Sequence, residues 1–236
     1  MAKQNKSLQI RDFILTRIRN GAWITGQKIP SEAELMSLFS ASRMTVHRAV
    51  KELAAEGHLL RERGRGTFVA KRIPRSELLT VRDIVVEIKE RGGTYYNEVK
   101  HVGYANQSAR LSHVFGGVPI ASIAHSIIVH YENGEPLQLE NRWVDLNMVP
   151  GYLTVDFTTC SPSRYLSQEA PLQKAEHELT AALPNQEQQN FLEIRAGDPC
   201  LLLKRKTWSG DRLVSYAELL YPASRYSFGG VFTPGT

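Results

Sequence analysis

The chain has 236 residues, of which 42% are hydrophobic and 22% are charged, and its formal net charge is +5. This composition is ordinary for a globular protein, and the length suits two domains, the larger of which can bury its own core. No apolar run approaches the roughly 20 residues that a membrane-spanning helix needs, so no membrane partner is expected. Residues 1–7 are polar and lack the hydrophobic core of a signal peptide. We therefore expect a cytoplasmic protein in which Cys160 and Cys200 are reduced.

Positive charge is concentrated in the first third of the chain. Residues 1–72 contain 14 Lys and Arg against 6 Asp and Glu, whereas residues 73–236 contain 15 against 18. A basic region beside a mildly acidic one is the distribution expected for contact with a phosphate backbone. A proline and mixed charges interrupt the pattern after residue 70. We predict a DNA-binding domain over residues 1–72, a linker over residues 73–80 and a second domain over residues 81–236.

Three helices are predicted before residue 57. The first shows an apolar residue at every fourth position and then a glycine: Ile10, Ile14, Ile18 and Gly21. The second begins after Ser31, where Glu34 completes a capping box. The third begins after Ser42, and its apolar residues form one stripe: Val46, Ala49, Val50, Leu53 and Ala54. Gly57 tolerates the positive φ that ends such a helix.

Residues 61–69 follow as a hairpin with a basic tip. Two helices joined by a turn and followed by such a hairpin form a winged helix-turn-helix, which fits the grooves of duplex DNA. Arg43, at the N-terminal end of the third helix, is expected to contact guanine, while Arg48 and Lys51 contact phosphates. The predicted DNA-binding residues are Ser31, Ser42, Arg43, Thr45, His47, Arg48, Lys51, Arg63, Arg65, Gly66 and Thr67.

The rest of the chain is predicted to form a helix and then an antiparallel sheet with helices packed on it. The helix covers residues 81–91, and further helical segments cover residues 162–168 and 185–194. Hairpin turns are indicated at Asn133-Gly134 and at Ser209-Gly210-Asp211. The predicted strands are residues 94–104, 107–115, 119–131, 136–145, 200–208 and 213–221. The predicted fold class is therefore α+β.

Several motifs resemble known protein families. Residues 30–32, 42–46, 56–57 and 64–69 resemble the winged helix of the GntR family of bacterial transcription regulators. Residues 134–140, 162–166 and 214–216 resemble the effector-binding UTRA domain, whose fold is that of chorismate lyase. Together they resemble the HutC branch of the family. This resemblance implies a homodimer that represses histidine-degradation genes and leaves double-stranded operator DNA when the small molecule urocanate binds.

The resemblance also implies an effector site in the second domain. Glu140 and Tyr221 stand where relatives contact the ligand, and Ser215 replaces a glutamate of the sugar sensors. Ile128 and His130 replace two phosphate-binding arginines, which argues against a phosphorylated sugar. An imidazole acrylate needs a cation or a helix N-terminus for its carboxylate and a polar partner for its ring. The predicted effector-binding residues are Arg82, Asp83, His130, Glu140, Ser163, Arg164, Tyr165, Ser215 and Tyr221.

Two alternatives stay open at this point. The first is an enzyme, because the UTRA fold is shared with a lyase. The sequence contains no Gly-x-Ser-x-Gly elbow, no His-Glu-x-x-His motif and no cysteine pair spaced for a metal. Catalytic residues, a metal and a cofactor are therefore not expected. The second alternative is a GntR-type regulator that senses a different small molecule.

Overall fold

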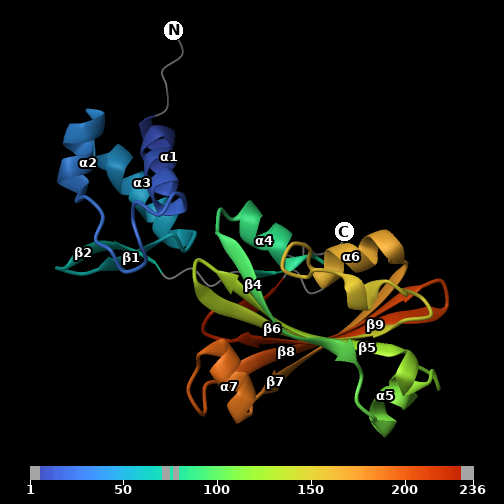
Figure 1. The fold of residues 1–236 in the computed structure, drawn as a ribbon. Helices are drawn as coiled ribbons and strands as arrows, with labels where there is room; N and C mark the ends of the chain where they lie inside the picture. The colour runs from blue at the N-terminus through green and yellow to red at the C-terminus, as the bar shows by residue number, and fades with distance from the viewer. Residues whose placement is uncertain (1–5, 71–74, 77–79, 230–236) are drawn as a thin grey trace, which may run out of the picture. The chain divides into compact units, whose positions relative to one another are not determined.

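A computed structural model describes residues 6–70, 75–76 and 80–229 (Figure 1). The chain divides into two compact units, Met1–Arg72 and Ile73–Thr236. The first unit contains helices followed by a short hairpin, and the second contains a large antiparallel sheet. None of the described helices has both the length and the apolar character needed to cross a membrane.

The described part of the first unit is a winged helix-turn-helix. Its elements are α1 (Lys6–Arg19), α2 (Glu32–Phe39), α3 (Arg43–Ala55), β1 (Leu59–Glu62) and β2 (Gly66–Val69). The Ser31 hydroxyl accepts from the backbone N–H of Glu34, whose carboxylate accepts from the backbone N–H of Ser31. Ser42 caps α3 by accepting from the backbone N–H of Thr45. Both predicted helix starts are confirmed.

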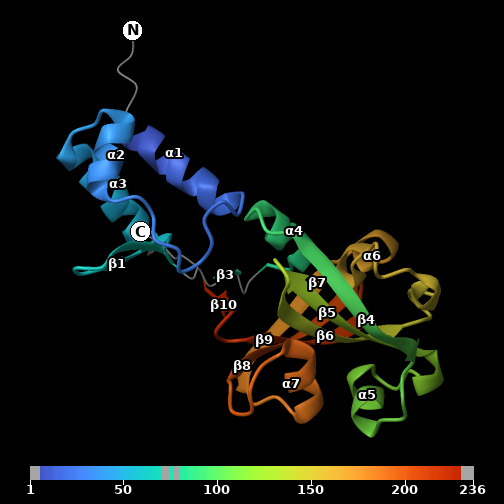
Figure 2. The same ribbon diagram turned by 60° about the vertical axis from the view of Figure 1, so that its left-hand side comes forward.

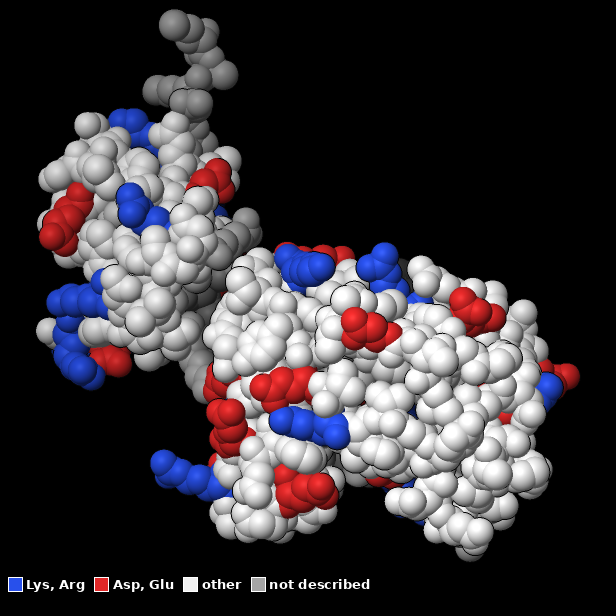
Figure 3. All heavy atoms as spheres, viewed as in Figure 1, with Lys and Arg blue, Asp and Glu red and all other residues white. Residues whose placement is uncertain are grey.

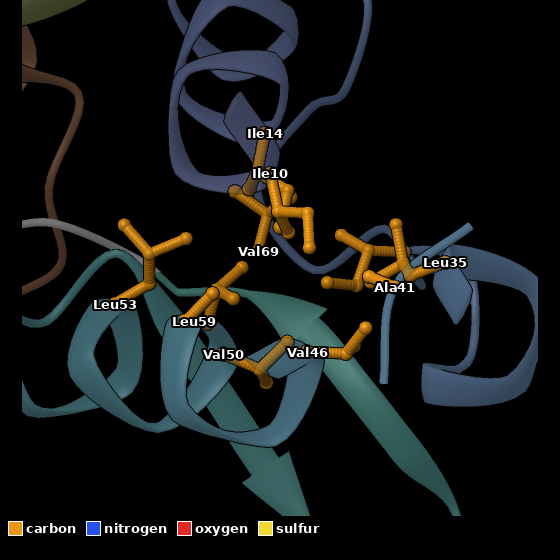
Figure 4. Close-up of a cluster of buried hydrophobic side chains, with 11 residues drawn as sticks. Ile10, Ile14, Leu35, Ala41, Val46, Val50, Leu53, Leu59 and Val69 are labelled. Carbon is orange, nitrogen blue, oxygen red and sulfur yellow. The ribbon is translucent and has the colours of Figure 1, made fainter. Parts of the chain in front are cut away.

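The core of this unit joins all three helices to the hairpin (Figure 4). Its fully or nearly fully buried residues include Ile10, Ile14, Leu35, Val46, Ala49, Val50, Leu53, Leu59 and Val69. Leu59 and Val69 face each other across β1 and β2, so the base of the hairpin is part of the core. The buried stripe of α3 matches the predicted one except for Ala54, which is half-buried. The opposite side of α3 is therefore left to solvent.

The hairpin β1–β2, called the wing from here on, depends on glycine. Gly64 has φ +76° and Gly66 has φ +127°, a region that L residues rarely adopt. A Cβ atom added to Gly66 would lie 2.6 Å from Cε of Lys28. Lys28 forms a β-bridge with Phe68, so the segment before α2 runs alongside the wing. These two glycines allow a tight turn between two very short strands.

The second unit is built on an antiparallel sheet with the strand order β4-β5-β6-β9-β8-β7. Its strands are β4 (Tyr95–Tyr104), β5 (Ile123–Glu132), β6 (Glu135–Asp145), β7 (Lys174–Ala182), β8 (Cys200–Ser209) and β9 (Arg212–Pro222). Asn133 and Gly134 both have positive φ, as a tight turn between β5 and β6 requires. A small parallel pair, β3 (Arg75–Ser76) with β10 (Ser227–Phe228), lies outside this sheet, and β3 falls within the predicted linker.

Helices cover both faces of the sheet (Figures 1 and 2). One face carries α4 (Ile84–Glu90) and α6 (Pro162–Glu169), and the other carries α5 (Ala109–Val114) and α7 (Gln186–Leu192). Short 3-10 turns lie at Ile120–Ser122 and Tyr152–Thr154. Ile84 and Ile88 of α4 pack on the first face, and Leu192 of α7 packs on the second. The predicted α+β class is confirmed.

Two parts of the predicted sheet were wrong. Residues 107–115, predicted to be a strand, contain the helix α5, because Ser108 caps it and Leu111 and Phe115 face the core four residues apart. The strand β7 was not predicted. Its residues are mostly exposed, so it lacks the alternation between apolar and polar residues that marks a half-buried strand.

The first unit should be sensitive to loss of core volume. Replacing the fully buried Leu53 with alanine should lower its free energy of unfolding by about 2–5 kcal/mol, because the packed helices cannot close the cavity. Leu38→Ala is the matched control, since Leu38 is 60% exposed, and should change stability by no more than about 0.5 kcal/mol. Scanning calorimetry should show the shift in one transition only. Equal effects of both substitutions would contradict the described core.

Candidate DNA interface and candidate effector site

The exposed side of α3 and the wing carries cations that are available for binding. Arg43 and Lys51 on α3 and Arg63 on the wing are exposed, and within the described residues none of them forms an ion pair. Figure 3 shows Lys and Arg side chains gathered at the end of the wing. Unpaired surface cations attract phosphate without first having to break an internal contact. These three residues are the strongest cationic candidates at this surface.

Other predicted DNA-binding residues are already paired with acids of the same unit. Nε of Arg48 lies 2.8 Å from Oε1 of Glu52, and Arg65 is paired with Glu62. Nδ1 of His47 lies 3.1 Å from Oε1 of Glu32, which links α3 to α2. Arg48 and Arg65 have to share their charge between a carboxylate and a phosphate, which weakens their contribution to binding, and the His47 ring can contact DNA only by sharing or leaving Glu32.

The N-terminal end of α3 also presents hydroxyl groups and one apolar side chain. Oγ of Ser42 lies 2.9 Å from Oγ1 of Thr45, so both hydroxyls lie at the first turn. Met44 was not among the predicted residues, although it is 76% exposed. Its position outside the buried stripe and next to Arg43 is the sequence signal that identifies it. Apolar side chains at such positions contact the methyl group of thymine.

A buried polar cluster lies on the face of the sheet that α4 and α6 cover. In β5 and β6, Ser126 pairs with Arg142, Ile128 with Glu140, and His130 with Gln138. Since alternate residues of a strand share a face, all of these side chains point to the same side. The buried polar residues on this face are Ser126, His130, Gln138, Glu140, Arg142, Arg205 and Ser215.

Arg142 is the centre of this cluster. Its Nε lies 2.7 Å from Oε1 of Glu140, and it donates hydrogen bonds to Oγ of Ser215 at 3.1 Å and Oγ of Ser163 at 3.3 Å. Burial opposes ionisation of Glu140, but the charge of Arg142, the neighbouring His130 and the hydrogen bond that Arg142 donates keep the pKa of Glu140 far below its usual value. Strands β6 and β9 and the first turn of α6 are thus joined through one guanidinium group.

His130 belongs to a second hydrogen-bond chain beside Arg142. Asn97 donates to the hydroxyl of Tyr95, which lies 2.9 Å from Nδ1 of His130. With the Tyr95 proton given to Nδ1, a neutral His130 carries its own proton on Nε2. That atom lies 3.5 Å from Oε2 of Glu140 but forms no hydrogen bond. Oδ1 of Asn97 and Oε1 of Gln138 are also buried and unpaired. Such orphaned atoms indicate a place for a polar ligand.

The first turns of α4 and α6 meet at the edge of this cluster. Asp83 caps α4 by accepting from the backbone N–H of Val85 at 2.8 Å, and Ser161 caps α6 by accepting from the backbone N–H of Arg164. The Ser161 hydroxyl also donates to Oδ2 of Asp83 at 2.5 Å. The negative charge of the Asp83 carboxylate would repel an anionic ligand at this point, although Asp83 was predicted to be an effector-binding residue.

The structure brings together only part of the predicted effector set. His130, Glu140, Ser163 and Ser215 surround Arg142. Tyr221 is hydrogen-bonded to Gln138. Asp83 lies at the edge of the cluster through its hydrogen bond with Ser161, and the other three predicted residues are placed elsewhere.

Arg164 and Tyr165 do not join the cluster through any hydrogen bond within the described residues, and Arg82 is engaged by a glutamate of α4. Arg82 is paired with Glu90, and Arg164 is exposed. The ring of Tyr165 packs near the rings of Tyr152 and Phe157, which lie in an apolar cluster. Tyr165 is therefore placed as a packing residue.

Four residues of the cluster were not predicted: Ser126, Gln138, Arg142 and Arg205. In the sequence, polar residues at every second position of a strand resemble a solvent-facing side. This polar face of the sheet is buried only because α4 and α6 pack over it.

A hollow of about 270 Å³ lies on the opposite face of the sheet. It is lined by residues of α5, β5, β6 and β9 and contains none of the predicted effector residues. Its one guanidinium group is satisfied, since Nη2 of Arg110 lies 2.8 Å from Oε1 of Glu218 and 2.9 Å from the hydroxyl of Tyr216. The polar cluster under α4 and α6 is the stronger candidate because it alone of the two contains orphaned buried atoms.

Comparisons with known proteins agree with this architecture. Residues 6–69 match the family described as bacterial regulatory proteins, gntR family, and residues 90–227 match the UTRA domain. A histidine utilization repressor from Klebsiella aerogenes is 42% identical over 228 residues, which cover 95% of this chain and 93% of the relative.

Two solved structures are similar to the chain. The C-terminal domain of a histidine utilization repressor from Pseudomonas syringae pv. tomato aligns with 60% of this chain and 100% of its own at 37% identity, with a TM-score of 0.57. PhnF from Mycobacterium smegmatis aligns with 96% of this chain and 100% of its own at 23% identity, with a TM-score of 0.80, and so supports the fold.

A winged helix followed by a UTRA domain defines a bacterial transcription regulator and not an enzyme. The chain belongs to the gntR family of bacterial regulators, in its HutC branch. The expectation drawn from the sequence motifs is thereby confirmed at the level of the family.

The Glu140–Arg142 pair should make stability depend on pH. The folded-state pKa of Glu140 is lowered, so the contribution of the pair is complete above the unfolded pKa of about 4.3 and is lost as pH falls below it. Glu140→Gln should cost about 3–5 kcal/mol at pH 7, because it leaves the Arg142 charge buried without a partner. The difference in free energy of unfolding between the Glu140→Gln protein and the unmodified protein should become smaller in acid. Urea unfolding at pH 7 and at about pH 3.5 measures both effects.

Glu178→Gln is the matched control. Glu178 lies on the mostly exposed strand β7 and is paired with Lys204 of the neighbouring strand β8. It should leave the unfolding curve almost unchanged at both pH values. A Glu140→Gln protein as stable at pH 7 as this control would show that the buried pair does not hold the strands together.

Proposed function

We propose that this protein is a cytoplasmic repressor of histidine-utilization genes that binds operator DNA as a homodimer and is released by urocanate. The proposal rests on the relatives, since histidine utilization repressors from Pseudomonas putida and Klebsiella aerogenes are 40% and 42% identical over 95% of the chain. The unpaired cations on α3 and the wing support the DNA-binding part. The orphaned polar atoms beside Arg142 support a small-molecule effector.

In this proposal α3 enters the major groove with its N-terminal end foremost. Arg43 contacts a guanine, and Met44, Thr45 and His47 lie beside it on the same turn or the next. The helix starts at Ser31 and Ser42 approach phosphates through their backbone N–H groups. The remaining predicted contacts are made to the DNA backbone or the minor groove by Arg48, Lys51, Arg63, Arg65, Gly66 and Thr67.

A homodimer gives the repressor two α3 helices for two half-sites. Adjacent major grooves on one side of B-DNA are about 34 Å apart, so both helices bind only when the dimer holds them at that spacing. Urocanate acts by favouring a domain arrangement with a different spacing. A ligand that bound both arrangements equally would not change the affinity for the operator.

Substitutions on α3 should separate base contacts from phosphate contacts. Arg43→Ala should weaken operator binding by about 1–3 kcal/mol and leave binding to random DNA nearly unchanged. Lys51→Ala should weaken binding to both DNAs and lower the slope of log affinity against log salt concentration by about 1. Fluorescence anisotropy titrations at several salt concentrations measure both quantities.

Lys89→Ala, which removes an exposed cation of the second domain, is the control for net charge and should have no effect on either DNA. An Arg43→Ala protein that binds the operator as tightly as the unmodified protein would remove Arg43 from the set that reads the sequence.

Urocanate should lower the affinity of the full-length protein for a histidine-utilization promoter fragment by about 5–150-fold, the usual range of allosteric coupling. Saturating operator DNA should lower the affinity for urocanate by the same factor, because coupling between two sites is reciprocal. Anisotropy and calorimetry measure the two sides of this cycle. Histidine and a sugar phosphate serve as comparison ligands. Release by the sugar phosphate alone would assign the repressor to another pathway.

A further inference from the structure

Arg205 on β8 is a buried cation of an unusual kind. Its side chain is only 6% exposed, and its Nε donates a hydrogen bond to Nε2 of His177 at 2.9 Å. None of the carboxylates in the described residues forms an ion pair with it. Arg142, two strands away on the same face, is equally buried but is neutralised by Glu140 at 2.7 Å. Burial lowers the pKa of Arg205, and the carboxylates of Glu140 and Glu87 only partly offset this effect because neither forms an ion pair with it.

A buried charge that forms no ion pair lowers the stability of the fold unless a ligand of opposite charge binds to it. The strand between the two arginines carries small side chains at this level, because Arg205 pairs with Ala217 and Ala217 pairs with Arg142. Ser215, the next residue on this face, is also small, and its Oγ lies 2.7 Å from Oγ1 of Thr207. Neighbouring strands are about 4.8 Å apart, so β6 and β8 lie roughly 10 Å apart, and β9 between them carries small side chains at this level.

The opposite end of the cluster offers one donor and one acceptor. His130 and Gln138 face each other across β5 and β6. Nε2 of His130 and Oε1 of Gln138 are both buried and have no hydrogen-bond partner, although Nε2 also lies 3.5 Å from Oε2 of Glu140. A neutral imidazole needs this combination, because one ring nitrogen accepts a hydrogen bond and the other donates one. The amide of Gln138 donates a hydrogen bond to the hydroxyl of Tyr221 on β9, the strand between β6 and β8, so this end of the cluster reaches the strand next to Arg205.

We propose that Arg205 binds the carboxylate of the effector while His130 and Gln138 bind its ring. The assignment rests on the proposed function and sharpens it. The site takes a flat monoanion with a carboxylate at one end and a neutral nitrogen heterocycle at the other. Arg142 is a positioning residue here, since Glu140, Ser163 and Ser215 already occupy its guanidinium group.

The test compares urocanate with its neutral amide by calorimetry on the full-length protein. The unmodified protein should bind urocanate about 10–100-fold more tightly than the amide, the range expected for hydrogen bonds to a charged group. Arg205→Gln should abolish this preference, so that both ligands bind with the affinity of the amide. Gln138→Met should instead weaken both ligands by a similar factor, because it removes a contact to the ring.

Three further measurements separate this role from a structural one. Arg205→Lys keeps the charge but loses the planar fork, so it should retain part of the preference for the carboxylate. The ligand-free Arg205→Gln protein should melt at the same temperature as the unmodified protein or higher, because a buried unpaired charge has been removed. Arg110→Gln, in the hollow on the opposite face of the sheet, should leave both affinities unchanged.

The outcomes distinguish failure of this assignment from failure of the proposed function. If the unmodified protein binds urocanate and Arg205→Gln keeps the full preference for the carboxylate, the assignment is overturned and the effector stands. Loss of affinity in Arg110→Gln would overturn it by placing the ligand on the other face. If the unmodified protein binds neither urocanate nor its amide, the proposed effector and the assignment fail together.

Discussion

The structure of the second domain depends on excluding water from charged side chains on one face of its sheet. Glu140 and Arg142 are 3% and 2% exposed, and a pair buried to this degree is tolerated only when every remaining hydrogen-bonding position is filled. Ser215 from the neighbouring strand and Ser163 from α6 fill two of these positions. The elements that exclude water from the Glu140–Arg142 pair therefore also supply its remaining hydrogen bonds. Displacing α6 would both expose the pair and remove the Ser163 hydrogen bond.

Much of the fold is written in local signals. The capping box at Ser31, the N-cap at Ser42 and the apolar stripe of α3 predict the helices of the first unit, because caps and a period of 3.6 residues are properties of single segments. The signals fail where tertiary contacts decide. Ala109–Val114 is too short for its period to distinguish a helix from a strand, and β7 is an edge strand with no buried side to show.

The two sites differ in how far they can be predicted. Exposure of Arg43 and Lys51 follows from the stripe on the other side of α3, and the Arg48–Glu52 pair is visible as a spacing of four residues. In the effector domain, His130, Glu140 and Ser215 were predicted from a family resemblance and not from the physical pattern of the sequence. Arg205 was missed because burial of a polar strand face depends on helices that the strand does not encode.

The contact between Asp83 and Ser161 joins two helices whose caps are 78 positions apart in the sequence. One carboxylate serves the first turn of α4 and, through a hydroxyl group, the first turn of α6. A tilt of either helix alone would break this shared cap, so the contact fixes the first turns of α4 and α6 relative to each other. Because α4 is the first helix of the second unit, the cover over the buried polar cluster is anchored near the start of that unit.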